Sequence, residues 1–437
     1  MFNASETIKE KLKQDSTFKQ LQVTILSTGE VIPQKNIVFE SFQYSAALWD
    51  GEEFNFGGCN AAEVKFKTLE FDKELTGEKI KVEIVVPDLS GFLYDNQKKQ
   101  IIDVNGDYIT TDGGYTSKYS GAEMQEFITA VGETATPTVT ESTVIPIGVF
   151  VVDSNETADN GGIVRQVIAY DQLYSGIKIN AKPYIDEMTK SYFYPSAYDV
   201  IRVMLEKLGI NCSINMESKM PINPLLNFRV PQFTDEDPNT NITDEDCVCL
   251  TILRDVCAAC GCWGYINRNG EFDVITVPSA VAEIYTKSLI RYNEIKTSDI
   301  VLPEQVASTY YPYKPGKVTI GRYPTGDLLD RVLFFGRNIV FRARDTSDTA
   351  TQLQQTIYNE IQKIPKTGAE TTVKGLPYLD IGDIIKLDGK NVLINSLEFS
   401  GIVGMKAKIT TQFKTAYEKY VETTFWQTGE MFTNGNV

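Results

Sequence analysis

Alternating apolar and polar residues predict that much of this chain folds as β-strands. Residues 80–86 (IKVEIVV) and 405–413 (MKAKITTQF) both place apolar side chains at alternate positions. A strand with this period buries one face and exposes the other to solvent. Asp-Gly and Asn-Gly pairs, which are typical of tight hairpin turns, occur at residues 50–51, 105–106, 269–270 and 388–389. We therefore expect antiparallel sheet to dominate the architecture.

Three stretches carry the signals of helices. Residues 196–208 (SAYDVIRVMLEKL) begin with a capping box, continue with an apolar stripe at spacings of three and four, and are followed by Gly209 as a stop. Residues 347–364 repeat the apolar stripe and are followed by a proline. The N-terminal residues 5–14 (SETIKEKLKQ) predict a shorter and more exposed helix.

Five of the seven cysteines lie within residues 246–263 (DCVCLTILRDVCAACGCW). Cys257 and Cys260 extend an apolar stripe at helical spacing, and this helix and the hairpin after it span residues 250–277. A zinc knuckle needs its cysteines on a tight turn, whereas the two alanines between Cys257 and Cys260 favour a helix. We interpret Cys257, Cys260 and Cys262 as structural core thiols. A four-cysteine metal site and redox chemistry are the alternatives, which this spacing favours less.

Size and composition indicate a globular protein with more than one domain. The chain has 437 residues, of which 42% are hydrophobic, and its longest apolar stretch, near residues 145–152, is too short to span a bilayer. The first thirty residues lack the basic start and apolar run of a secretory signal. We therefore expect the chain to fold in a reducing cytoplasm, where its cysteines stay as thiols.

Charge and missing residue types disfavour several classes of function. The chain has 42 basic and 58 acidic residues, a formal net charge of −16, which disfavours gripping nucleic acid. It has no histidine, the usual general base near neutral pH and a common zinc ligand. Residues 103–114 (DVNGDYITTDGG) begin like a calcium loop but lack its central glycine and final glutamate, so a hairpin tip is the better interpretation. We expect no cofactor, no metal and no enzymatic activity.

Breaks in the periodicity divide the chain into predicted parts. These are an N-terminal helical segment (1–19), a β domain (20–178), a small α+β domain (180–287), a second β domain (288–415) and a C-terminal tail (416–437). The first β domain contains a polar, aperiodic insertion at residues 113–144, and the second contains the helix at 347–364. Such an insertion gains little by packing on its own chain, so we expect another copy or an adjacent protein to contact it.

The order of several motifs resembles the hub proteins at the tip of phage tails. The motifs are FNFGGCNAAEVKFK (54–67), IPIGVFVVDS (145–154), VIAYDQLY (167–174), LRDVCAACGCWGYINRNGEFDVI (253–275) and LDIGDIIKLDGKNVLINSLEF (379–399). They are similar to the tail-associated proteins of long-tailed phages of Gram-positive hosts and to the central hub of contractile baseplates. The motifs are hydrophobic patterns and turns that run over most of the chain.

The resemblance implies a mainly β fold in which two tube-like antiparallel β-barrel domains flank the α+β domain. It implies a homotrimer whose six β domains match a sixfold tail tube, close its distal end and gate the passage of DNA. The implied partners are distal tail or tail tube proteins above, the C-terminus of the tape-measure protein, and fibre, spike or receptor-binding proteins below. DNA is expected to pass without specific binding. The implied location is the tail tip of the virion, after synthesis in the host cytoplasm.

Other functions are less favoured. Many members of the resembled family continue into a peptidase, a wall hydrolase or a receptor-binding module, whereas this sequence stops at Val437, so we expect other subunits to carry these functions. The runner-up interpretation is a secreted or surface β-rich protein that binds carbohydrate, which the missing signal and the free thiols disfavour. An enzyme is the third interpretation, and it requires titratable groups that converge in a pocket.

Overall fold

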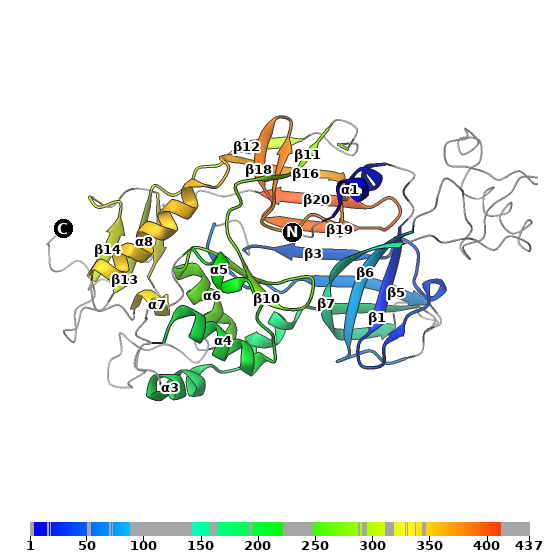
Figure 1. Cartoon of the computed structure of the whole chain (residues 1–437), viewed down its shortest axis with the longest axis horizontal. Coiled ribbons are helices and arrows are strands. Elements are labelled where there is room, and N and C mark those ends of the chain that lie inside the picture. Colours follow the sequence, from blue (N-terminus) through cyan, green and yellow to red (C-terminus); the bar gives the residue numbers. More distant parts are fainter. Residues whose placement is uncertain are drawn as a thin grey trace, which may run out of the picture.

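The computed structural model is a mainly β protein in which most helices gather at one side of the sheets (Figure 1). It describes residues 4–14, 17, 19–49, 54–69, 71, 73–87, 142–157, 164–191, 195–221, 248–286, 289–290, 295–310, 319–327, 329, 331–336, 338–342 and 347–411. None of the helices within these residues is long and apolar enough to cross a membrane.

The largest sheet has 11 strands among the described residues and is antiparallel throughout. Its order is β12 (Lys296–Asp299), β16 (Thr367–Lys374), β20 (Lys406–Thr411), β19 (Ser396–Ser400), β3 (Gln43–Ala47), β5 (Glu63–Leu69), β8 (Val164–Tyr170), β7 (Ser142–Thr157), β6 (Lys79–Pro87), β1 (Gln20–Ile25) and β2 (Glu30–Val31). A closed barrel needs its first and last strands to pair, and β12 and β2 do not pair within the described part. The expected closed barrels are therefore not found, although the mainly β, antiparallel fold is confirmed.

Strands from both ends of the chain share this sheet. β3 from the N-terminal part pairs with β19 from the C-terminal part, with Gln43 opposite Ser400 and Ala47 opposite Ser396. One main-chain ladder thus joins the two regions in which β domains were predicted from the sequence. The division of the chain into separate domains stays a prediction.

Three smaller sheets of three strands each complete the β-structure of the described residues. The first is β10 (Phe272–Ile275), β9 (Trp263–Ile266) and β4 (Gly57–Gly58); the second is β11 (Val281–Tyr285), β17 (Ile384–Leu387) and β18 (Lys390–Leu393); the third is β14 (Thr319–Tyr323), β13 (Gln305–Tyr310) and β15 (Val332–Phe335). The third sheet lies between β12 and β16 in the chain and packs against α8. It interrupts the region in which a second β domain was predicted.

Four helices lie close to their predicted positions: α1 (Glu6–Lys13), α4 (Ala197–Leu208), α6 (Cys249–Ala259) and α8 (Ser347–Gln362). The described residues also contain helices that were not predicted from the sequence, namely η1 (Gln34–Asn36), η2 (Gln172–Ile177), α3 (Lys182–Ser191), α5 (Met216–Lys219) and α7 (Ile339–Arg342). The predicted capping box of α4 is confirmed, because Ser196 and Asp199 each accept a backbone hydrogen bond from the other. Gly209 ends α4 in the left-handed conformation, with φ of 65°.

Both predicted hairpins that fall on described residues are present. Asp388 and Gly389 link β17 to β18 as a two-residue turn. Asn269 and Gly270 lie in the longer loop 267–271 between β9 and β10, where Gly270 has positive φ and Asn269 does not, so this loop is not the type I′ turn expected of an Asn-Gly pair. The insertion predicted at 113–144 lies outside the described residues except for 142–144, which already belong to β7. The calcium-loop-like residues at 103–114 and the tail at 416–437 also lie outside them.

One hydrophobic core runs beneath the large sheet and into the helical region. An aromatic group at its centre connects the β9–β10 hairpin to the N-terminal strands. The Trp263 ring lies 4.7 Å from the Phe56 ring and 5.9 Å from the Trp49 ring, measured between centroids. The Trp263 Nε1–H also donates to the backbone oxygen of Asn55 at 2.8 Å, so the buried indole has a partner.

Candidate functional site

The solvent-facing side of the large sheet is the candidate functional surface. In β5, β19 and β20 each buried side chain alternates with an accessible one. The buried side chains, such as Phe66 and Phe399, join the core, so the sheet has one apolar and one polar side. We define the polar face by Gln43, Ser45, Glu63, Lys65, Lys67, Lys296, Glu370, Thr372, Ser396, Glu398, Ser400, Lys406, Lys408 and Thr410.

Strand register places the polar face in rows that cross from the N-terminal to the C-terminal strands. Directly paired residues in antiparallel strands project to the same side of a sheet, so their side chains are neighbours. One row contains Glu63, Ser45, Glu398, Lys408 and Thr372. The next contains Lys65, Gln43, Ser400 and Lys406, and it ends at Lys374, which is buried and lies outside the polar face. Each row crosses five strands, so the surface is continuous over the β3–β19 junction.

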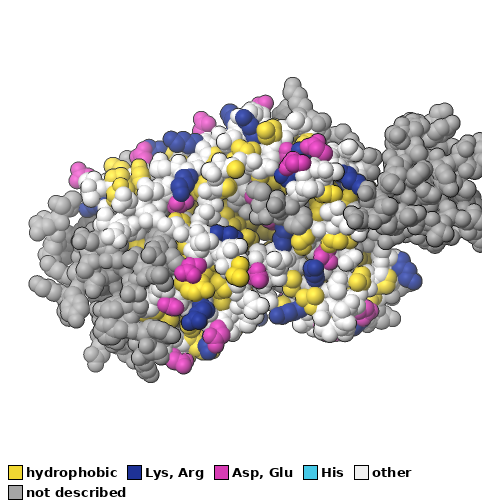
Figure 2. Space-filling model, in the orientation of Figure 1, with side chains coloured by type: hydrophobic (Ala, Val, Ile, Leu, Met, Phe, Trp, Pro, Cys, Tyr) yellow, Lys and Arg dark blue, Asp and Glu magenta, His cyan; other side chains and the backbone are white. Residues whose placement is uncertain are grey.

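Acidic and basic groups are mixed on the polar face. Lys65 Nζ lies 2.6 Å from Glu63 Oε1, and Lys408 Nζ lies 3.6 Å from Glu398 Oε1. Exposed pairs of this kind add little to stability, but each places opposite charges side by side. The side of the molecule seen in Figure 2 likewise intersperses acidic and basic side chains. The polar face thus carries acidic and basic groups together, whereas the chain as a whole is strongly acidic.

The structure places all three predicted core thiols in the interior. Cys257 lies in α6, Cys260 caps this helix, and Cys262 precedes β9, each with 0% exposure. Cys262 Sγ also contacts the backbone oxygen of Cys257 at 3.4 Å. Among the described residues, no group of three or more histidine, cysteine or acidic side chains is arranged to hold a metal ion. The structural role of these thiols stays a prediction, which metal analysis tests.

The sequence reasoning missed a further thiol beside them. Cys59 lies directly after β4, and its side chain is a hydrogen-bond partner of Cys257. Burial, together with the neighbouring Cys257 thiol, raises the pKa of Cys59 well above its usual range. Hydrogen bonding to Cys262 and burial likewise raise the pKa of Cys257. These groups are therefore protonated at neutral pH, and protonated thiols are poor nucleophiles and poor metal ligands.

Asp171 is the second buried polar group that sequence reasoning missed. Its carboxylate accepts hydrogen bonds from the backbone nitrogens of Ala62, at 2.7 Å, and Leu173, at 2.9 Å. It therefore ties the start of β5 to the first turn of η2. Burial raises the pKa of Asp171 to about 7, although both backbone hydrogen bonds act to lower it. The aspartate after the apolar strand in VIAYDQLY is the signal that could have indicated a cap.

Comparison with known proteins gives no match to a family model and none to a curated protein. Similar solved structures do exist. A tail protein from Neisseria meningitidis MC58 is 11% identical, with a TM-score of 0.46, over 90% of this chain and 96% of that one. A prophage tail protein from Listeria monocytogenes EGD-e is 10% identical, with a TM-score of 0.43, over 93% of this chain and 99% of that one.

A chain of the Francisella PdpA–VgrG complex is also similar. It is 7% identical, with a TM-score of 0.38, over 91% of this chain and 59% of that one. Phage tail proteins, the class that the sequence motifs resemble, are thus among the solved structures to which this chain is similar.

Proposed function

We propose that this chain is a non-enzymatic, structural subunit of a phage tail, and that three copies form a ring-shaped hub at the distal end of the tail tube. One observation carries the proposal: β3 and β19 join N-terminal and C-terminal strands into a single sheet with one polar side. Each copy then supplies two adjacent stretches of the ring wall, and three copies supply six. The tail-hub motifs of the sequence support the same function.

In this hub the polar face lines the central channel. A polyanion is held where many basic groups neutralise its phosphates, and on this face lysines such as Lys65 and Lys408 already have glutamate neighbours. A hydrated surface of mixed charge lets DNA pass without holding it. Tail tube or distal tail proteins then bind above the ring, the C-terminus of the tape-measure protein enters it, and fibre, spike or receptor-binding proteins attach below.

The two edges of the large sheet support assembly into a ring. Among the described residues the edge strands are β12 and β2, and all four residues of β12 and both residues of β2 are exposed. Exposed sheet edges pair readily with other strands, so neighbouring copies can cover them. Obligate contacts of this kind bury more than about 1,000 Å² in total.

The test is the mass and symmetry of the purified protein. We expect light scattering to give a trimer at high protein concentration, and electron microscopy to show threefold rings with a central opening. Val31→Lys, which places a charge in β2 on a residue that is 46% exposed, should weaken the trimer. The control Val403→Lys, on a residue that is 37% exposed beyond β19, should not. A ring of another order, or a single copy in an assembled tail, contradicts the proposal.

A further inference from the structure

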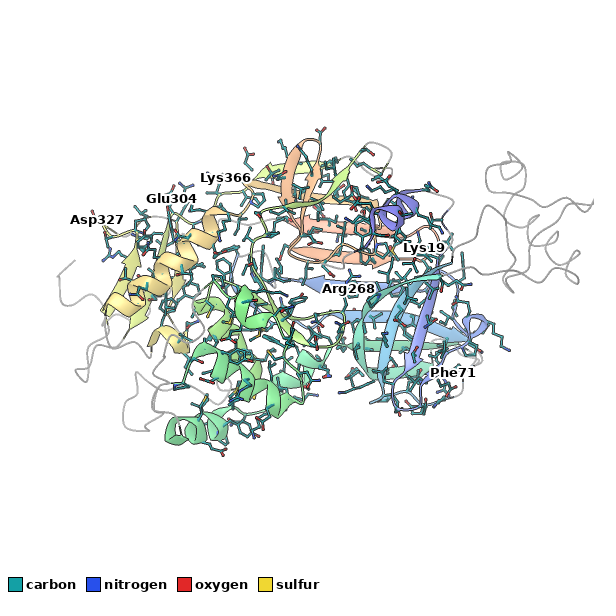
Figure 3. All side chains as sticks on the ribbon, in the orientation of Figure 1. Lys19, Phe71, Arg268, Glu304, Asp327 and Lys366 are labelled. Atoms are coloured by element: carbon teal, nitrogen blue, oxygen red, sulfur yellow. The ribbon has the colours of Figure 1, made fainter. Side chains whose placement is uncertain are left out.

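The turn between β9 and β10 holds one arginine in a fixed position. Asn267 Oδ1 accepts hydrogen bonds from the backbone nitrogens of Asn269, at 2.9 Å, and Glu271, at 3.1 Å. The backbone nitrogen of Gly270 donates to Asn267 O at 2.9 Å, and its φ of +81° suits glycine. Arg268 belongs to this turn and lies near the centre of the view in Figure 3, and its side chain is only 11% exposed.

The guanidinium group of Arg268 makes five hydrogen bonds in a buried site. Nε and Nη2 donate to the two carboxylate oxygens of Asp380, at 2.9 and 3.0 Å. Nη2 also donates to Leu379 O at 2.9 Å, and Nη1 donates to Pro146 O at 2.8 Å and to Pro377 O at 2.7 Å. A guanidinium has five N–H groups, so this set can engage each of them.

The acceptors come from two distant parts of the chain. Pro146 belongs to β7, whereas the other acceptors lie between β16 and β17. The pairing of β6 with β7 shifts register at this point: Val82 lies opposite Gly148 and Glu83 opposite Pro146, so Ile147 is an extra residue. Such a bulge turns neighbouring backbone groups away from the ladder. The carbonyl of Pro146 that accepts from Arg268 lies directly beside this bulge.

The hairpin also fits closely between the same two parts. A side chain at Gly270 would come within 3.0 Å of Val149 in β7. A side chain at Gly382 would come within 2.4 Å of Ile275 in β10. Glycine at both contacts allows the hairpin to pack closely against β7 and the segment before β17, so that Arg268 reaches its acceptors.

We propose that Arg268 is a clasp that holds the β9–β10 hairpin, β7 and residues 376–383 together at this junction, and that its loss opens the junction while each part stays folded. A buried arginine with well-oriented partners fixes one arrangement of the three parts. Any displacement of one part separates the guanidinium from Asp380 or from the carbonyl groups that accept its hydrogen bonds. The three parts retain other support. β9 still pairs with β4, and β7 still pairs with β6 and β8. In the third part, the backbone nitrogen of Gly382 still donates to Ile394 O at 2.8 Å. The clasp does not depend on the proposed tail function, since it acts within one copy.

Hydrogen–deuterium exchange of the full chain tests the clasp. The variants are Arg268→Lys, which keeps the charge but loses the planar fork, and Asp380→Asn, which keeps the shape but loses the charge. We expect exchange on the order of tenfold faster in peptides covering 144–149, 267–271 and 376–383. Peptides from α4 and β20 should exchange as in the wild type. If the arginine variant does not fold, Asp380→Asn alone carries the test.

The matched control is Arg254→Lys in α6. Arg254 donates to Gly58 O at 3.0 Å and to Asn60 Oδ1 at 2.9 Å, so its loss should loosen residues 58–60 and leave 376–383 unchanged. The double variant of Arg268 and Asp380 should exchange no faster than the more affected single variant, because both remove one contact. Unchanged exchange at 376–383, equal acceleration throughout the chain, or the same pattern in the Arg254 variant overturns the proposal.

Discussion

Asp171 illustrates how one buried side chain changes the pH dependence of folding. Its pKa of about 7 in the folded protein lies above the ordinary value of 3.8, because burial disfavours the charged form. The folded state therefore binds this proton more tightly than the unfolded state does. The contribution to stability is present at low pH and is lost as the pH rises through about 7.

We expect Asp171→Asn to reduce this pH dependence. For the wild type, the titration of Asp171 should raise the free energy of unfolding by on the order of 2 kcal/mol between pH 8 and about pH 5.5. In the variant this contribution disappears, because the amide does not titrate. Urea denaturation at both pH values measures the difference between the two proteins. Asp299→Asn, on the exposed edge strand β12, serves as the control and should keep the wild-type dependence. An Asp171 variant with wild-type pH dependence would contradict the assignment.

The thiols of α6 give a second prediction at the residue scale. Since Cys257 and Cys260 are fully buried and Cys257 holds its proton, the purified protein should contain no stoichiometric zinc. Changing either cysteine to alanine should lower the free energy of unfolding by on the order of 1 kcal/mol, as a small core truncation does. Cys212→Ala, at a half-buried position, should cost less. Elemental analysis that finds about one zinc per chain, lost when Cys257 and Cys260 are both replaced, would refute the prediction.

At the scale of elements, local sequence patterns predict the helices and turns whose ends are fixed by residues next to them. The ends of α4 follow from Ser196 and Gly209, which cap it. The β17–β18 turn follows from Asp388 and Gly389, which both adopt positive φ as a type I′ turn requires. In these cases the chemistry that fixes the element lies within a few residues of it.

Contacts between distant elements could not be predicted in this way. The pairing of β3 with β19 depends on how Ala47 and Ser396 meet in three dimensions, and the alternating pattern of either strand fits many partners. Cys59 lies beside the thiols of α6 only because β4 pairs with β9. β4 consists of two glycines, which have no alternation of apolar and polar side chains from which a strand could be predicted. The clasp at Arg268 likewise joins residues that are far apart in the chain and lies beside a bulge in β7, and one extra residue leaves no clear signal in the sequence.

The segment between β6 and β7 provides a prediction about one element. Pro87 and Ser142 are directly opposite each other, so a short Asn-Gly turn can replace residues 88–141 without changing the strand register. This replacement removes residues 113–141, which make up most of the predicted insertion. We expect this insertion to contact another copy or an adjacent protein. The variant should remain folded by circular dichroism but form fewer trimers by light scattering. Trimer formation equal to that of the wild type would count against a role in assembly.

At the scale of the whole molecule, the balance of charge on the polar face differs from that of the chain as a whole. The chain carries a formal net charge of −16, yet the polar face carries lysines and glutamates side by side. The overall acidic balance repels a polyanion at long range, while the glutamates beside Lys65 and Lys408 oppose the approach of phosphates at contact. Both properties suit a channel through which DNA moves, and both can be altered by substitution.

DNA binding by the assembled protein therefore tests this distribution of charge. The wild type should not bind duplex DNA measurably at physiological salt. Replacing Glu63 and Glu398 together by lysine turns one row of the polar face into a basic stripe, so this variant should bind DNA at low salt and release it steeply as salt rises. The control replaces Glu206 and Glu217, exposed residues of α4 and α5, and reaches the same net charge, −16 + 4 = −12. Fluorescence anisotropy of a labelled duplex measures all three proteins. Tight binding by the wild type, or equal binding by both variants, would show that the polar face does not determine the interaction with DNA.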